Sequence, residues 1–464
     1  MKNKIIIALV AVILILVIAL SLTIGIIGAY RSLGSYPTLP STNQNDPTQT
    51  EHIDFNNTFD LIHALFSNFS IFDVDYENAM LSAIHAYIAA TGDKYAMYYT
   101  PDELETMIAE NNGDLYGVGV QVIFDYSEYF IEVVLIMPNS PAEVHLQLGD
   151  KITHIFVDDN KTSLVDLVEE NKAKARELYP SFSDEEINNL ACYETFNYAV
   201  SNLRGPEGTL AHFFINRNNE EIEMQVQRAK VKTLSVTAKK SIRDDTVGIV
   251  SISQFDLTTP TQFKECMDKL IAEGCNKFVF DVRNNPGGDV ASVAAVLSAF
   301  LKEGDTIYST KDTNGTVEVI KAREVQYSAS SGYSTCNVSK SDIGKYRDYE
   351  FVVLTNENSA SSAEIFTSAL RDHQLAQIVG TKTYGKGSVQ SIITLQYYGE
   401  QYYGALKLTT KLYFPPCGVG YDGGIGITPD YIVDLEGIAT ETHFYKLTEE
   451  IDNQLQKAVS ILID

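Results

Sequence analysis

The sequence predicts a chain of several domains built on an α/β fold, with a helical N-terminal region and one transmembrane helix. Three observations support this prediction. At 464 residues the chain is too long for a single ordinary hydrophobic core. Strand-like and helix-like segments alternate from residue 246 onward, which is typical of parallel β/α units. An uncharged apolar run from Ile5 to Ala29 precedes all other segments.

Composition and charge exclude several classes of protein. Apolar residues make up 45% and charged residues 21% of the chain, which indicates a folded protein and not a disordered one. The net charge is -26 and no basic cluster is present, so we expect no nucleic-acid partner. The five cysteines are scattered and form no C-x-x-C pair. We therefore expect no metal site, no disulfide framework and no cofactor.

The N-terminal apolar run predicts a membrane anchor. As a helix it would be roughly 37 Å long, enough to cross a bilayer with some tilt. A cleaved signal peptide is the alternative, but the run exceeds the usual apolar region and no A-x-A-like site closes it. Lys2 and Lys4 precede the run and only Arg31 follows closely, so the positive-inside rule places the N-terminus in the cytoplasm. We expect residues 1–30 to be the cytoplasmic end and anchor of a single-pass cell-membrane protein, with the rest extracytoplasmic.

Two further segments precede the larger domains. Residues 31–50 are rich in Pro, Ser, Thr and Asn without apolar periodicity, which predicts a flexible stalk. Residues 51–113 carry apolar residues at helical spacing and predict a small helical region. His63 and His85 lie in this region, and we expect ordinary helix residues there because no second donor has metal spacing.

A different pattern begins at residue 114 and extends to about 235. The run Gly117-Val118-Gly119-Val120 precedes an alternating strand, and its glycines let backbone N–H groups turn outward. GDKITHI (149–155) and RGPEGT (204–209) follow in order. This segment resembles a PDZ domain. The resemblance implies that the Gly117–Val120 run forms a backbone nest for a peptide's terminal carboxylate, while the peptide adds as a strand at the sheet edge.

Two details of this PDZ-like segment stay open. An insertion at about 160–200 is charged and helix-prone, so we expect a solvated excursion, with changed access to the peptide groove as the alternative. Arg204 is a candidate second contact for a bound tail. An ordinary surface arginine explains Arg204 equally well.

Residues 236–464 predict β/α units. The strands TVGIVSISQF and NKFVFDVR alternate with the helices TPTQFKECMDKLIAEG and DVASVAAVLSAFLKEG. A hairpin around Asn314-Gly315 follows, and then the strand YEFVVLT. In parallel sheets of this kind, sites lie at the carboxyl ends of the strands.

Two of these strand ends carry residues with chemical potential. In DVRNNPGGDV, Gly287 and Gly288 allow backbone N–H groups to point at a developing negative charge. In NSASSAEIF, the serines Ser359, Ser361 and Ser362 fall in the first turn of a predicted helix, where unpaired N–H groups and the helix dipole favour an anion. On its own the serine cluster is better explained by helix capping.

A nucleophilic serine also needs a base. His373 is the nearest histidine, but a continuous helix would place it roughly 18 Å from Ser361, out of hydrogen-bond reach. Lys386 lies between two glycines in GTKTYGKGSVQ, with Gln390 four positions later. That spacing places Lys386 and Gln390 on one face of a helix or a strand, but only a helical turn would bring the side chains into direct contact. A lone lysine in such a loop is usually solvated.

The motifs together resemble the C-terminal processing peptidases, also called tail-specific proteases. The PDZ-like segment, DVRNNPGG, SASSAE and GKGSVQ occur in the family's order, and the resemblance covers roughly residues 90–460. It implies a crotonase-like or Clp-protease-like α/β core that carries an inserted PDZ-like domain. It further implies protein or peptide substrates with exposed C-terminal tails, and a homodimer as a possible assembly.

Carried over by position, the resemblance also assigns roles. Ser361 would be the nucleophile, Lys386 the general base and Gln390 the residue that orients Lys386. Three backbone N–H groups would supply the oxyanion hole, those of Ser362, Gly287 and Gly288. Because a lysine with its ordinary pKa of about 10.4 is protonated at neutral pH, Lys386 would have to be desolvated.

We therefore expect residues 236–464 to be the catalytic domain of a membrane-anchored extracytoplasmic serine endopeptidase that recognises C-terminal tails. One alternative is a catalytically inactive PDZ adaptor that binds peptides, and the joint presence of Ser, Lys and Gln argues against it. Acyl-CoA chemistry on a crotonase-like core is a second alternative. It rests on fold analogy alone, and an extracytoplasmic location argues against it.

Overall fold

The computed structural model describes residues 55–157, 160–328, 335–396 and 402–464. The chain divides into two compact units, residues 1–98 and residues 99–464. The anchor and stalk predicted for residues 1–50 lie outside the described residues. None of the helices in the described ranges is long and apolar enough to span a bilayer.

The described residues of the first unit form two helices, α2 (Phe55–Phe69) and α3 (Tyr76–Ala90), in the region where apolar residues recur at helical spacing. Helix α3 begins after Asp75, whose carboxylate accepts a hydrogen bond from the Asn78 N–H at 3.1 Å. Strand β1 (Met97–Tyr99) leads into the second unit. Helix α4 (Pro101–Asn111) opens that unit and begins with a capping box between Thr100 and Glu103.

The small domain, residues 114–232, is built around an antiparallel sheet of order β3-β4-β5-β7-β8, with β6 paired to β5. The first strand of the domain, β2, and its last strand, β9, pair as a two-stranded antiparallel ribbon. The elements are β2 (Asp114–Gly117), β3 (Val120–Asp125), β4 (Phe130–Ile136), η1 (Pro141–Val144), β5 (Lys151–Val157), β6 (Asn160–Ser163), α5 (Leu164–Leu178), α6 (Asp184–Leu203), β7 (Leu210–Arg217), β8 (Glu220–Gln227) and β9 (Ala229–Lys232).

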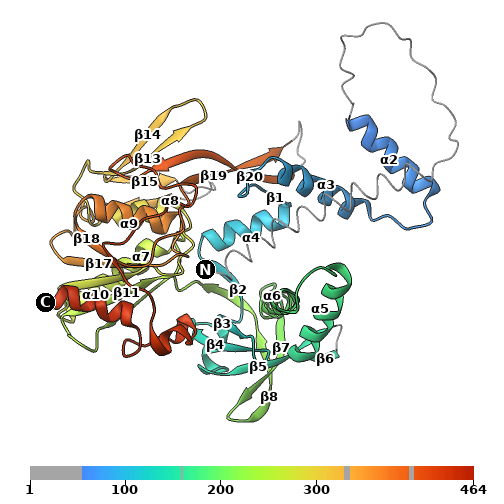
Figure 1. Cartoon of the computed structure of the whole chain (residues 1–464), viewed down its shortest axis with the longest axis horizontal. Helices are drawn as coiled ribbons and strands as arrows, with labels where there is room; N and C mark the ends of the chain where they lie inside the picture. Colours follow the sequence, from blue (N-terminus) through green and yellow to red (C-terminus); the bar gives the residue numbers. More distant parts are fainter. Residues whose placement is uncertain (1–54, 158–159, 329–334, 397–401) are drawn as a thin grey trace, which may run out of the picture. The chain divides into compact units, whose positions relative to one another are not determined.

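The predicted insertion is a pair of helices, α5 and α6, that lie side by side (Figure 1). Leu164 and Val168 of α5 and Ala191 and Ala199 of α6 are fully buried in the core of the small domain. The expectation of a solvated excursion is therefore wrong for one face of this segment. The charged residues that suggested it occupy the opposite, exposed face, as in any amphipathic helix.

The large domain, residues 233–464, contains a six-stranded sheet of order β10-β11-β12-β17-β18-β21. Strand β10 is antiparallel to β11, and every other pair is parallel. The sheet and its helices are β10 (Val236–Lys240), β11 (Val247–Ile252), α7 (Thr259–Ala272), β12 (Lys277–Asp281), α8 (Val290–Ser298), β17 (Glu350–Thr355), α9 (Ser362–Asp372), β18 (Ala376–Gly380), β21 (Tyr431–Ile432) and α10 (Asn453–Ile463).

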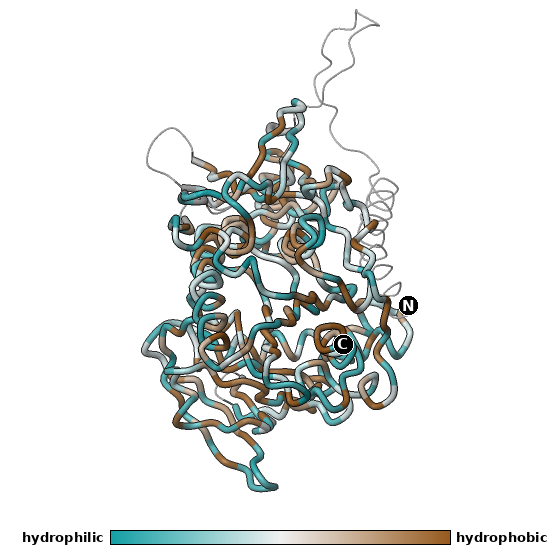
Figure 2. The backbone as a smooth tube through the Cα atoms, turned by 90° about the vertical axis from the view of Figure 1, so that its left-hand side faces the viewer, coloured by the Kyte–Doolittle hydropathy of each residue, from teal (hydrophilic) through white to brown (hydrophobic). Residues whose placement is uncertain are grey.

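Both faces of this sheet are buried, which explains why its strands are nearly continuous apolar runs. In β12, Phe278 and Phe280 point into the core shared with α7, α8 and α9, while Val279 belongs to the opposite cluster beside α10. Figure 2 shows hydrophobic stretches in brown alternating with hydrophilic stretches in teal along the chain. Burying both faces fixes the register of the strands and thus the position of their carboxyl ends.

A second sheet joins strands that come before and after the nucleophile segment. Strand β20 (Tyr402–Phe414) pairs with both β13 (Thr306–Asp312) and β19 (Ser388–Gln396), and β13 pairs with β14 (Val317–Lys321). The predicted hairpin around Asn314-Gly315 is confirmed by the β13–β14 pairing. The remaining elements are the hairpin of β15 (Val325–Ser328) and β16 (Thr335–Val338), and the short helices η2 (Gly437–Thr440) and η3 (Phe444–Lys446).

Candidate active site

Ser361 occupies a strained turn between β17 and α9. Strand β17 ends at Thr355 and α9 begins at Ser362, so Ser361 stands at the N-terminus of the helix. Its backbone angles are φ 55° and ψ -116°, a region that non-glycine residues rarely adopt because of steric crowding. Such strain persists only where the surroundings impose it, and it is typical of a nucleophile on a strand-to-helix turn.

Hydrogen bonds to the end of the neighbouring strand β12 impose this turn. The Ser359 hydroxyl donates to the Val282 carbonyl at 2.7 Å, and the Ala360 N–H donates to the Asn285 carbonyl at 2.9 Å. Ser359 is fully buried, and its hydroxyl also accepts a bond from the Asn356 N–H at 2.9 Å. Ser359 is therefore bound into the turn and is not available as a nucleophile.

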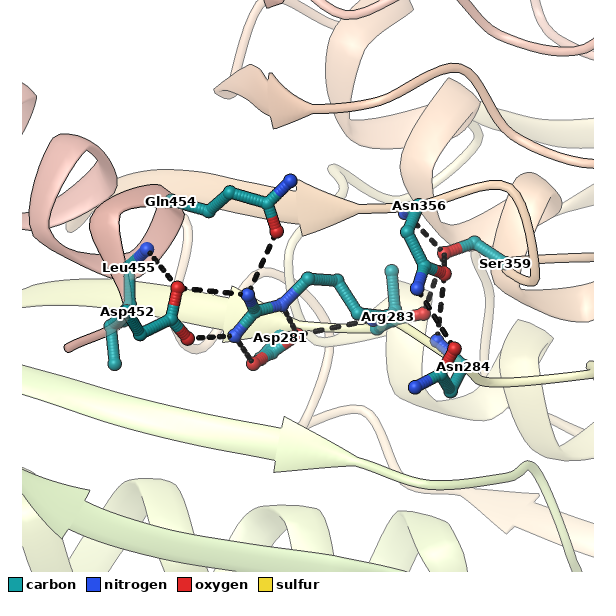
Figure 3. Close-up of polar contacts among 9 residues, drawn as sticks. Asp281, Arg283, Asn284, Asn356, Ser359, Asp452, Gln454 and Leu455 are labelled. Atoms are coloured by element: carbon teal, nitrogen blue, oxygen red, sulfur yellow. Dashed lines mark hydrogen bonds and ion pairs between the residues drawn. The ribbon is translucent and has the colours of Figure 1, made fainter. Parts of the chain in front are cut away.

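Asparagine side chains add a second connection between the two strand ends (Figure 3). The Asn284 N–H donates to Asn356 Oδ1 at 2.9 Å, and Asn356 Nδ2 donates back to Asn284 Oδ1 at 2.8 Å. On the other side of Asn284, the buried Arg283 guanidinium pairs with Asp281 and Asp452, each at 2.7 Å. Since Asp452 caps α10, this network connects the C-terminal helix to the strand ends that hold Ser361.

The Gly287-Gly288 turn lies directly against the nucleophile segment. Its φ angles are 102° and 137°, and a Cβ placed on Gly287 would come within 2.7 Å of Ser361 Cβ and 2.9 Å of Ser362 N. Only glycine allows this approach without displacement. The Ser362 hydroxyl donates to the Gly288 carbonyl at 2.9 Å, which joins the turn to the start of α9.

Of the three N–H groups predicted to form the oxyanion hole, two are free to donate to a ligand. The Gly287 N–H donates to Asn285 Oδ1 at 2.8 Å and is therefore occupied. The N–H groups of Gly288 and Ser362 donate to no acceptor among the described residues. Ser362 is the first residue of α9, where an N–H has no partner within the helix. The pair can bind an anion that forms beside Ser361.

Ser361, Lys386 and Gln390 line one cavity of about 250 Å³ together with Gly288. The three side chains are partly buried. Residues separated by long stretches of sequence thus come together at the carboxyl ends of β12 and β17, as the topology predicted.

Gln390 lies on strand β19 and not on a helical turn. Its Nε2 donates to the hydroxyls of Ser388 and Thr409, each at 3.1 Å, so the amide is held from two sides. Lys386 precedes the same strand by two residues. Its spacing of four from Gln390 therefore does not imply direct contact between the two side chains, as it would on a helix. The orienting role of Gln390 stays a prediction.

Glu364 is an important residue that the motif analysis overlooked. Its side chain is completely buried, and its carboxylate accepts hydrogen bonds from the N–H groups of Ser361 at 2.9 Å and Lys386 at 2.8 Å. It also accepts from the Thr383 hydroxyl at 2.5 Å and the Gly385 N–H at 2.8 Å. Burial raises the pKa of the Glu364 carboxyl, while these four hydrogen bonds favour its charged form. The S-x-x-E spacing from Ser361 was a sequence signal for this residue.

His373 has a different role from that of a base. It stands at the C-terminal end of α9, where its Nε2 lies 2.7 Å from the Thr306 carbonyl oxygen. This contact connects α9 to β13 of the second sheet. The reasoning that excluded His373 as the base of Ser361 is consistent with this placement.

A larger cavity of about 700 Å³ lies against the small domain and contains the Gly117–Val120 run. Gly119 has φ 86°, and its carbonyl accepts the Met137 N–H at 3.0 Å, while the Val118 carbonyl accepts the Ala142 N–H at 2.8 Å. With both carbonyls turned away, the N–H groups of Val118 and Gly119 donate to nothing in the described ranges. Consecutive open N–H groups of this kind form an anion-binding concavity.

Arg204 also lines this cavity, at the C-terminal end of α6. Its guanidinium forms an ion pair with Glu110 at 3.0 Å, and 52% of its side chain is exposed. Arg204 is thus near the groove but already has an acidic partner. Its role as a tail sensor stays a prediction.

Nothing in the described part of the chain suggests a metal centre. Within those ranges, no group of three or more His, Cys, Asp or Glu side chains could hold a metal ion.

Known proteins resemble this chain in sequence and, more weakly, in structure. Residues 246–433 match the model of peptidase family S41. The chain is 27% identical over 360 residues to a probable CtpA-like serine protease of Staphylococcus aureus (strain N315), covering 78% of this chain and 61% of that protein. A protein of the same description from Staphylococcus haemolyticus (strain JCSC1435) is 27% identical over 350 residues, with 75% of this chain and 59% of that protein covered. The chain thus spans less than two thirds of the length of these relatives.

Two solved structures show weaker similarity. The photosystem II D1 C-terminal processing protease matches with a TM-score of 0.42 and 20% identity, covering 81% of this chain and 86% of that chain. A putative S41 protease from Bacteroides fragilis NCTC 9343 matches with a TM-score of 0.47 and 14% identity, covering 85% and 92%. Residues 246–433, which include Ser361, Lys386 and Gln390, are thus similar to peptidase family S41, and a longer part of the chain is similar to CtpA-like serine proteases.

Proposed function

We propose that the protein is a membrane-anchored, extracytoplasmic serine endopeptidase that recognises protein C-terminal tails and cleaves peptide bonds with a Ser361–Lys386 dyad. One observation carries this proposal. Ser361 has a strained backbone at the N-terminus of α9, and it shares a cavity with Lys386 and with the open N–H group of Gly288. A capping serine needs none of these features, since caps adopt ordinary extended backbone angles.

In the acylation step, Ser361 Oγ attacks the carbonyl carbon of the scissile peptide bond and Lys386 Nζ takes the hydroxyl proton. The carbonyl oxygen becomes an oxyanion, and the N–H groups of Gly288 and Ser362 donate to it. Lys386 then gives its proton to the leaving amine as the C–N bond breaks. The products of this step are an acyl-enzyme on Ser361 and a free amine.

Deacylation repeats the sequence with water. Lys386 takes a proton from the water, which attacks the acyl carbon, and the same two N–H groups stabilise the second oxyanion. The proton returns to Ser361 Oγ as the ester bond breaks. Gln390 contributes by orienting the Lys386 side chain, and no metal or cofactor takes part.

For substrate recognition we propose that residues 114–235 act as a PDZ-like domain inserted before a crotonase-like or Clp-protease-like core. The open N–H groups of Val118 and Gly119 support this proposal, because they suit a terminal carboxylate. The side chains that line the same cavity include Leu135 and Val122, which suit an apolar C-terminal residue. Helix α6 forms one wall of the groove.

For location we propose that residues 1–30 anchor the chain with its N-terminus in the cytoplasm. Two features support this proposal, the apolar run itself and the positive charges of Lys2 and Lys4 that precede it. Proteinase added to intact cells should then digest the domains after residue 50. Protection of these domains in cells with a verified sealed membrane would contradict it.

The experiment that tests the function compares new protein termini by mass spectrometry. Extracytoplasmic proteins are incubated with the full-length chain in detergent, as wild type and as Ser361→Ala. We expect new termini near substrate C-terminal ends with the wild type only. Specific capture of tails by both proteins without any new terminus would instead favour the inactive PDZ adaptor.

A further inference from the structure

We propose that Tyr413 and Glu364 are positioning residues that hold the backbones of Ser361 and Lys386 at a fixed separation, so that the two side chains work as a dyad. The inference rests on the proposed function. It assigns a role to two buried groups that the reaction itself does not use.

The two members of the dyad come from different layers of the fold. Ser361 ends the β17 segment of the large sheet, whereas Lys386 precedes β19 of the second sheet. Proton transfer between them requires hydrogen-bond distance, and a displacement of about 1 Å can cost on the order of a hundredfold in rate. If only the packing of the two sheets set the separation of Ser361 and Lys386, it would depend on many contacts far from the site.

Glu364 joins the two N–H groups. A single oxygen, Oε2, accepts from the Ser361 N–H at 2.9 Å and from the Lys386 N–H at 2.8 Å. The other oxygen, Oε1, is fixed by the Thr383 hydroxyl at 2.5 Å and the Gly385 N–H at 2.8 Å. The side chain of Glu364 is completely buried, so these bonds are shielded from water.

Tyr413 joins the two carbonyl groups of the same residues. Its hydroxyl lies 3.1 Å from the Ser361 carbonyl oxygen and also donates to the Lys386 carbonyl. Its own N–H donates to the Gly387 carbonyl at 2.9 Å, so Tyr413 holds the lysine loop at two points. Ser361 and Lys386 are therefore connected once through an acceptor that their N–H groups share, and once through the single hydroxyl proton of Tyr413, which lies between their two carbonyl oxygens.

Tyr413 is suited to a fixed role. Only 2% of the residue is exposed, and it lies on β20, the strand that pairs with both β13 and β19. Burial raises the pKa of the Tyr413 phenol well above its usual value of 10.0, so the hydroxyl remains a donor throughout the working pH range.

The test replaces Tyr413 by Phe, which removes the hydroxyl and keeps the ring. The chain offers a matched control, Tyr421→Phe. Tyr421 is 4% exposed and packs edge-on against Tyr413 with ring centroids 5.4 Å apart, and its hydroxyl makes no hydrogen bond to the described atoms of Ser361 or Lys386. The control therefore removes a buried phenol hydroxyl from the same cluster without touching Ser361 or Lys386.

The first readout is the rate at which a fluorophosphonate labels Ser361 in the full-length protein, measured by peptide mass spectrometry. In that reaction Ser361 Oγ displaces fluoride from phosphorus and its proton passes to the base. We expect Tyr413→Phe to slow labelling by about 10- to 100-fold, and Tyr421→Phe to match the wild type. In peptide cleavage the Tyr413→Phe loss should fall on kcat, with KM changed less than about twofold.

Equal labelling rates for Tyr413→Phe and Tyr421→Phe would overturn the inference while leaving the dyad intact. A folded wild type that is not labelled at Ser361 would overturn the proposed function and this inference with it. Glu364→Gln gives an independent check, because its single amide oxygen can still accept from Ser361 and Lys386. We expect Glu364→Gln to retain more labelling than Glu364→Ala, and the reverse order would contradict the positioning role of Glu364.

Discussion

The Ser361 segment and the Gly117–Val120 run are both glycine-assisted backbone turns, but they are held in opposite ways. Residues around Ser361 are fixed by bonds to Val282, Asn285 and Glu364, while the N–H groups of Gly288 and Ser362 donate to no described acceptor. In the Gly117–Val120 run, the carbonyls are fixed and successive N–H groups are open. This difference fits the proposed roles, in which the first site holds reacting atoms in place and the second presents donors to a ligand.

The largest loss of activity is expected when Lys386, the proposed base, is replaced. Lys386→Arg should lower kcat/KM to the level of Ser361→Ala, a loss of about 1000-fold or more, because a guanidinium stays protonated and cannot accept the Ser361 proton. The measurement is peptide cleavage from pH 6 to 10. Wild-type activity should rise with pH as the lysine loses its proton, and substantial activity in Lys386→Arg at any pH would rule out the dyad.

A smaller but still large effect is expected at the oxyanion turn. In Gly287→Ala, the new Cβ would lie 2.7 Å from Ser361 Cβ and 2.9 Å from Ser362 N, so both groups must move. We expect kcat to fall by about 100- to 1000-fold, as when an oxyanion donor is lost. Gly304→Ala is the control for backbone strain, since Gly304 has φ 90° and no atom within 4 Å of its added Cβ. Similar kcat values for the two variants would exclude crowding of the nucleophile.

Changes in the Gly117–Val120 run should have an intermediate effect on activity, confined to substrate recognition. A substrate with a free C-terminus should be cleaved roughly 5- to 100-fold faster at low concentration than its amidated form, because the amide leaves N–H donors unpaired. Gly119→Ala brings a Cβ within 2.2 Å of Ser140 Cβ and should abolish this preference. Gly149→Ala, with φ 85° and open space around its Cβ, should keep the preference. Equal wild-type rates on both substrates would contradict tail recognition.

The smallest effect is expected for Gln390→Ala. Gln390 is held by Ser388 and Thr409, and in the proposed mechanism it acts only on the orientation of Lys386, so we expect kcat to fall by about tenfold. Gln390→Glu keeps the side-chain shape and would test whether the amide itself matters. A loss as large as that of Lys386→Ala would assign Gln390 to the reaction itself.

Much of the large domain could be predicted because its signals are local. Apolar periodicity predicts the strand β12 and the helices α7 and α8. The role of Gly287 and Gly288 could be predicted because only glycine allows so close a backbone approach. The strand ends that carry Ser361 and the glycine turn are neighbours because parallel strands align their carboxyl ends.

The features that were missed depend on contacts between distant segments. Tyr413 has no local motif, and its position against Ser361 and Lys386 follows only from the pairing of β20 with β19. In α5 nearly half of the residues are charged, although Leu164 and Val168 share one buried face. Charge therefore suggested a solvated segment where spacing would have indicated an amphipathic one.

The most direct test of the account is a double-mutant cycle on the dyad. Peptide cleavage is measured for Ser361→Ala, Lys386→Ala and the double variant, with equal folded fractions verified by unfolding. If Ser361 is the nucleophile and Lys386 its base, each single variant should lose about 1000-fold or more in kcat and the double variant should lose no more than either one. Losses that multiply in the double variant would show that the two residues act independently, and would contradict the dyad.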